Sequence, residues 1–122
     1  MQNKVKILIA DDNAYLRQAL QDMLIEKEYL VETVQNGYEL LVYLKERSAD
    51  IIILDIMMPG RSGIEIISTI RSASPYAKII LYTGFQKYKD SIYAHIVDKF
   101  LLKNGNIHSL LQAIEELAQR TK

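Results

Sequence analysis

Polar side chains that could bind a metal ion or an anion follow four apolar segments of this 122-residue chain. Asp11 and Asp12 follow the first of these segments, Asp55 follows another, and Thr83 and Lys103 follow two more. Three carboxylates held close together suit a hard divalent cation, which prefers oxygen ligands. A lysine beside them suits an anion. A metal ion and an anion next to a carboxylate indicate phosphoryl transfer to that carboxylate.

Apolar runs of strand length alternate along the chain with segments of helical period. The runs predict strands at residues 5–10, 29–34, 51–54, 78–82 and 99–102. The helical segments are 14–26, 39–46, 62–72, 87–96 and the stretch from 107 onward, with Asn36-Gly37 as a turn. This alternation predicts an α/β fold, a parallel sheet with helices on both faces. Because the carboxyl ends of parallel strands share one edge, the polar side chains should meet there.

Composition narrows the classes of protein that fit. With 49% hydrophobic and 25% charged residues, the chain reads as one soluble domain over residues 1–122. A formal net charge of zero lacks the basic field of nucleic-acid binding, so no such contact is expected. The absence of cysteine excludes thiolate metal sites. No apolar run is long enough for a signal peptide or a membrane span, so a cytoplasmic location is expected.

The polar residues are informative together rather than one at a time. A single aspartate after a strand is more often a turn former or a helix N-cap than a ligand. The joint pattern resembles the receiver domain of two-component response regulators over essentially the full chain. The matching features are Asp11-Asp12, Asp55 in the string Asp55-Ile56-Met57-Met58-Pro59-Gly60, Thr83 and Lys103. The resemblance implies a flavodoxin-like, doubly wound (βα)5 fold with strand order 2-1-3-4-5.

The resemblance also implies how the acidic residues share the work. Asp55 would be the phosphoacceptor, taking a phosphoryl group from a sensor histidine kinase or a phosphotransfer protein. Mg²⁺, or Mn²⁺ in its place, would be bound by Asp12, Asp55 and the backbone carbonyl of Met57. Asp11 would act on the same ion mainly through water. Such a site suits Mg²⁺, which takes oxygen ligands and keeps several waters.

A switch is the second implication of the resemblance. Lys103 and Thr83 would each contact a phosphoryl oxygen, since phosphorylation adds negative charge and strong acceptor oxygens. The Thr83 hydroxyl would move toward these oxygens, and Phe100, at the switch-aromatic position, would turn into the space behind it. Simple core packing explains Phe100 equally well.

Two further positions are predicted to set how long the phosphoryl group lasts. Met57 and Phe85 stand two residues after Asp55 and Thr83, where family members tune dephosphorylation. Neither side chain can orient or activate a water molecule. The sequence therefore predicts slow self-dephosphorylation.

The chain departs from the family pattern near its fourth helix. Asn104-Gly105 follows Lys103 where the family usually has proline, so Lys103 is expected to be held less rigidly. The stretch between Thr83 and Lys103 is about two residues short, and Ile96-Val97-Asp98 replaces the usual Gly-Ala. A short or displaced fourth helix is expected.

Several functions remain open on these grounds. The leading one is a signalling switch that changes its partner-binding surface and is no enzyme beyond its own phosphorylation and dephosphorylation. A degenerate receiver, acting as a constitutive interaction module, is the alternative. An aspartyl-phosphate phosphohydrolase would need an acid where Met57 stands, and strand-end aspartates would repel the phosphate of a flavin. Dimerisation on activation is common in the family and is left open, and the downstream partner cannot be read from the sequence.

Overall fold

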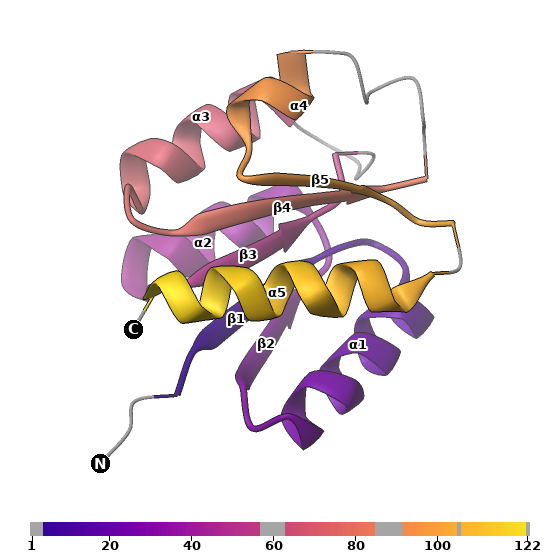
Figure 1. Ribbon diagram of the computed structural model, residues 1–122. Helices are drawn as coiled ribbons and strands as arrows, with labels where there is room; N and C mark the ends of the chain where they lie inside the picture. The colour runs from indigo at the N-terminus through magenta and orange to yellow at the C-terminus, as the bar shows by residue number, and fades with distance from the viewer. Residues whose placement is uncertain (1–3, 57–62, 85–91, 105, 122) are drawn as a thin grey trace.

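A five-stranded parallel sheet in the order β2-β1-β3-β4-β5 organises the chain (Figure 1). The computed structural model describes residues 4–56, 63–84, 92–104 and 106–121. The strands are β1 (Lys6–Ala10), β2 (Leu30–Val34), β3 (Ile51–Leu54), β4 (Lys78–Thr83) and β5 (Lys99–Leu102). The helices are α1 (Ala14–Glu26), α2 (Gly37–Glu46), α3 (Gly63–Ala73), α4 (Ile92–Ile96) and α5 (Ile107–Thr121). The predicted fold class and strand order are confirmed.

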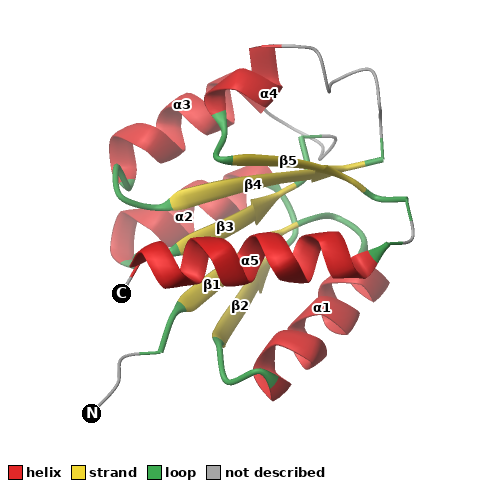
Figure 2. Cartoon of the chain, in the orientation of Figure 1, coloured by secondary structure: helices red, strands yellow, loops and turns green. Residues whose placement is uncertain are grey.

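Helices cover both faces of the sheet, and each face has its own apolar core (Figure 2). The α2/α3 cluster consists of Leu8, Ala10, Val34, Leu40, Leu44, Ala49, Ile52, Leu54, Ile56, Ile66, Ile67, Ile70, Ala77, Ile79 and Leu81. The α1/α5 cluster consists of Val5, Ile7, Ile9, Leu20, Leu24, Ile51, Ile53, Ile80, Tyr82, Leu110, Ala113, Ile114, Leu117 and Ala118. Successive strand residues alternate between the clusters, because side chains along a strand point to opposite faces. Continuous apolar runs in β1, β3 and β4 are explained by burial on both sides.

Asparagine side chains fix where three helices begin. Asn13 Oδ1 accepts the Leu16 amide at 3.1 Å and caps α1. Asn36 Oδ1 accepts the amide of the third residue of α2 at 2.8 Å. Asn106 Oδ1 accepts the His108 amide at 3.1 Å at the start of α5. Each bond satisfies an amide that has no partner within its helix.

Some element bounds differ from the sequence prediction. Gly37, predicted in a turn, is the first residue of α2, where an added Cβ would stand 2.9 Å from Ile66 Cδ1 of α3. A larger residue at this position would require the end of the Ile66 side chain to shift. Thr83, predicted just beyond a strand, is the last residue of β4. The described part of α4 begins at Ile92, and residues 87–91 of the predicted helix lie outside the described residues. Among the described helices, none has the length and apolar character required to cross a bilayer.

Candidate functional site

The acidic side chains predicted at the sheet edge lie together. β1 and β3 are neighbours, and the Asp55 amide donates to the Ala10 carbonyl at 3.0 Å just beyond their ladder. Asp11, Asp12 and Asp55 each place a carboxylate oxygen within 4.8 Å of the other two. Asp11 and Asp55 are buried, at 3% and 6% exposure, whereas Asp12 is open to solvent. The strand order thus builds a cluster of carboxylate oxygens with one accessible side.

Lys103 follows the edge strand β5, and its side chain reaches this cluster. Its Nζ lies 2.6 Å from Asp11 Oδ2 and 2.6 Å from Asp55 Oδ2. Its backbone amide donates to the Thr83 carbonyl at 2.8 Å, which continues the β4–β5 ladder. Burial acts to lower the pKa of Lys103, but the hydrogen bonds to Asp11 and Asp55 outweigh burial and raise its pKa. Lys103 therefore remains a cation that balances the two buried carboxylates.

Asp11 is also fixed by groups that sequence reasoning missed. Its Oδ1 accepts the Asn13 amide at 2.9 Å, and its backbone carbonyl accepts Arg17 Nη1 at 2.7 Å. Its own amide donates to the Val34 carbonyl at 3.2 Å. The sequence signal for Arg17 is its place one turn into the helix that Asn13 caps. These bonds hold the Asp11 carboxylate toward the site rather than toward solvent.

The predicted switch residues lie on the opposite face of the sheet from the carboxylates. Thr83 is fully buried and comes two residues after Leu81, which belongs to the α2/α3 cluster. Phe100 is half-buried, pairs with Leu81 across β4 and β5, and packs against the same cluster. Asp11, Asp55 and Lys103 instead follow Ile9, Ile53 and Leu101, which pack on the α1/α5 side. The site is therefore divided between the two faces.

The donor set fits a divalent cation. Three carboxylates and one ammonium group leave two negative charges, which one divalent ion would neutralise. All the side-chain donors in the cluster are oxygens, the ligands that Mg²⁺ prefers. The remaining predicted ligand, the carbonyl of Met57, lies outside the described residues, and so does Phe85.

Comparison with known proteins agrees with this geometry. The family model for the response regulator receiver domain matches residues 7–115. Chemotaxis protein CheY of Halobacterium salinarum is 30% identical over 115 residues, which cover 92% of this chain and 95% of that protein. A nitrate/nitrite response regulator protein homolog of Haemophilus influenzae is 32% identical over 124 residues. That match covers 98% of this chain, which spans 59% of the relative's length.

Solved structures give the same result. The response regulator protein TrrA of Thermotoga maritima, in complex with Mg²⁺ and BeF, superposes with a TM-score of 0.85 at 34% identity. The match covers 93% of this chain and 98% of that one. The fold and the edge site define an α/β signalling module of the two-component class. The chain belongs to the response regulator receiver domain family, as its resemblance to that family predicted.

Proposed function

We propose that this chain is a phosphorylation-dependent switch that accepts a phosphoryl group on Asp55 and then changes its partner-binding surface. The observation that carries the proposal is the meeting of Asp11, Asp12, Asp55 and Lys103 at one sheet edge. Membership of the receiver family supports it. TrrA, 34% identical to this chain, has also been solved in complex with the histidine kinase ThkA. A sensor histidine kinase or phosphotransfer protein in the cytoplasm is accordingly the proposed donor.

The chemistry follows from which atoms face one another. A carboxylate oxygen of Asp55 attacks the donor's phosphorus in line, an O–P bond forms, and the P–N bond to the donor histidine breaks. Asp11, Asp12 and Asp55, with the Met57 carbonyl, would hold Mg²⁺ or Mn²⁺. When bound, the ion would offset repulsion between these carboxylates and the incoming oxygens. Lys103 Nζ, 2.6 Å from Asp55 Oδ2, is within reach of a phosphoryl oxygen on that residue.

Signal output in this proposal begins on the other face. The Thr83 hydroxyl moves toward the phosphoryl group, because phosphorylation brings charge and acceptor oxygens to the edge. Phe100 shares the α2/α3 face with Thr83 and would fill the space that is left. An almost complete shift between two states takes about 5.5 kcal/mol of differential interaction. Two or three charge-assisted hydrogen bonds would supply much of it.

The chain acts on no substrate but itself in this proposal. Its reactions are its own phosphorylation and its own dephosphorylation. The dephosphorylation would be slow, because neither Met57 nor Phe85 can activate a water molecule. The competing function is a receiver that no longer cycles, motivated by the missing proline after Lys103. The two short contacts of Lys103 with Asp11 and Asp55 favour a working site over that alternative.

Labelling with a small donor tests the proposal. The protein is incubated with acetyl phosphate and Mg²⁺, and intact mass reports the addition of a phosphoryl group. We expect labelling of the wild type, and none in Asp55→Asn or after chelation of the metal. An unlabelled wild type would support the degenerate receiver, and labelling that persists in Asp55→Asn would place the acceptor elsewhere.

A further inference from the structure

Tyr82 stands in the same row of the sheet as the two buried carboxylates. The ladder positions Ala10, Leu54 and Leu81 are in register across β1, β3 and β4, and the next residues along these strands are Asp11, Asp55 and Tyr82. The residues two positions earlier, Ile9, Ile53 and Ile80, all pack in the α1/α5 cluster. Because side chains repeat every second residue along a strand, all three members of the row face the α1/α5 side.

The Lys103 side chain has to pass over Tyr82 to reach its partners. Lys103 follows β5, whereas Asp55 and Asp11 follow β3 and β1, and β4 lies between them (Figure 1). Leu101, two residues before Lys103, pairs directly with Tyr82. Lys103 Nζ lies 5.9 Å from the centre of the Tyr82 ring. The ring is therefore next to the path of the lysine across the sheet edge.

The ring is held firmly enough to serve as a support. Tyr82 is 5% exposed and belongs to the α1/α5 cluster, where it packs with residues of α5. Burial raises the pKa of the Tyr82 hydroxyl, so the ring stays neutral beside the cation. An ammonium group within about 6 Å of an aromatic centre is attracted by the negative face of the ring. An aliphatic residue at position 82 would fill the volume without that attraction.

We propose that Tyr82 is a positioning residue for Lys103, whose ring steers the ammonium group toward Asp55 and the phosphoryl group it would carry. The inference rests on the proposed function and deepens it. Asn104-Gly105 follows Lys103, so no proline ring restricts the backbone at that point. The contact with Tyr82 supplies a restraint from the side-chain end. Tyr82 acts only through Lys103 and touches no reacting atom.

A double-mutant cycle tests whether Tyr82 acts through Lys103. We expect Tyr82→Leu to slow labelling by acetyl phosphate about two- to fivefold, the range of a cation–π contact, and Tyr82→Phe to retain most of the rate. In a Lys103→Met background, Tyr82→Leu should have no further effect. Tyr76→Leu is the matched control, because Tyr76 is 92% exposed and precedes β4, at the opposite edge of the sheet from the site. Equal rates in Tyr82→Leu and Tyr82→Phe, or a loss that persists without Lys103, would overturn the inference.

A second measurement reads the contact without any phosphorylation. In protein labelled with ¹³C at lysine Cε, the Lys103 resonance is identified by its loss in Lys103→Met. We expect this resonance to shift in Tyr82→Leu, which removes the ring current, and to stay near its original position in Tyr82→Phe. A Lys103 resonance that ignores both substitutions would overturn the inference. If the wild type is never labelled on Asp55, the proposed function fails, while this spectrum still decides whether Tyr82 holds Lys103.

Discussion

Aspartates stand at both ends of the parallel strands, and the two edges use them differently. At the amino edge, Asp50 Oδ2 accepts the Lys6 amide at 2.8 Å, and Asp98 Oδ2 accepts the Ile79 amide at 2.7 Å. These carboxylates satisfy backbone donors at the start of neighbouring strands. At the carboxyl edge, Asp11 and Asp55 face each other and share one ammonium group. At the amino edge each carboxylate bonds a strand amide, whereas the crowded carboxylates of the carboxyl edge need a nearby cation to offset their mutual repulsion.

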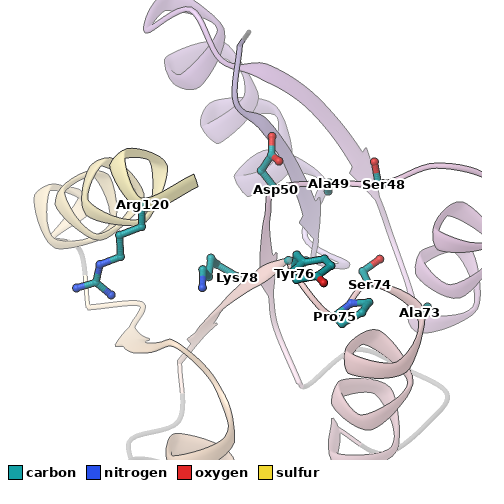
Figure 3. A pocket seen from close by; sticks show the side chains of 10 residues that line it. Ser48, Ala49, Asp50, Ala73, Ser74, Pro75, Tyr76, Lys78 and Arg120 are labelled. Atoms are coloured by element: carbon teal, nitrogen blue, oxygen red, sulfur yellow. The ribbon is translucent and has the colours of Figure 1, made fainter. Parts of the chain in front are cut away.

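The presence of a cavity is a poor guide to which edge of the sheet carries the functional site. A hollow of about 570 Å³ lies at the amino edge, and Asp50, Tyr76, Lys78 and Arg120 are among its lining residues (Figure 3). Its single carboxylate is already bonded to the Lys6 amide. The carboxyl edge gathers three carboxylates instead. Crowding of like charges is therefore the better sign of chemistry in this molecule.

Removing one carboxylate from the crowded edge should have the largest effect. Asp12→Asn deletes a charged ligand, so we expect Mg²⁺ affinity to fall about a hundredfold, as measured by calorimetric titration. The free energy of unfolding should stay the same or rise slightly, because repulsion within the cluster is relieved. Asp50→Asn is the control and should bind Mg²⁺ normally. Unchanged affinity in Asp12→Asn would contradict the assignment of this edge as the metal site.

Asp98 should show the opposite behaviour. Its Oδ2 also contacts Arg71 Nη2 at 3.1 Å, and Arg71 donates to the carbonyls of Ala77 and Ile96, both at 3.1 Å. Asp98→Ala leaves the Ile79 amide without its acceptor, so we expect a loss of about 2 kcal/mol in urea unfolding. Mg²⁺ binding should persist. Asp98→Asn keeps an acceptor oxygen and should lose about half as much, whereas equal losses in both variants would argue against the hydrogen bond as the cause.

Asp50 should matter less, since the one hydrogen bond recorded for its side chain among the described residues goes to the Lys6 amide. We expect Asp50→Ala to lower the free energy of unfolding by about 1 kcal/mol. Urea unfolding beside Asp98→Ala would measure both on one scale. A loss larger than that of Asp98→Ala would break the ranking drawn from their contacts.

The smallest effect belongs to Glu32, which pairs with Lys6 Nζ at 3.1 Å and Arg47 Nη1 at 2.8 Å. Burial alone would raise the pKa of Glu32, but its bonds to Lys6 and Tyr43 outweigh burial and lower it. A lowered pKa means that the carboxylate stabilises the fold above its ordinary pKa, and that this contribution is lost as the pH falls through the lowered value.

Glu32→Gln tests that reasoning. The side chain is 37% exposed, so solvent screens the pair, and we expect a loss of about 0.5 kcal/mol at pH 7. Unfolding measured below the folded pKa should show wild type and variant converging. A difference that is as large in acid as at neutral pH would exclude the ion pair as its source.

The sequence predicted the cluster of carboxylates at the carboxyl edge, but it did not predict the structural aspartates at the amino edge. Apolar runs that stop at Asp11, Asp55 and Lys103 reveal strand ends, and a parallel sheet brings such ends together. The hydrogen bonds of Asp50 and Asp98 were not predictable. An acidic residue before a strand looks the same in sequence as any loop residue, and its partner amide is known only once the strands are aligned.

Register also explains the residues near the site that were missed. Tyr82 is one more apolar residue in the β4 run, and its place under Lys103 depends on the alignment of three strands. The hydrogen bond from Arg17 to the Asp11 carbonyl depends on the direction in which α1 leaves the loop, which the sequence does not give. The role of Phe100 remains a prediction, since its half-buried side chain agrees with both core packing and switching.

The division of the site between two faces has a consequence for how such a molecule can be altered. In the proposed function, capture of the phosphoryl group would depend on Asp11, Asp55 and Lys103 on one face, and its readout would begin at Thr83 and Phe100 on the other. Substitutions near Phe100 would then alter the readout while leaving the carboxylates and Lys103 in place. If the proposed function holds, evolution or engineering would be able to change the output of this small domain separately from its phosphoryl chemistry.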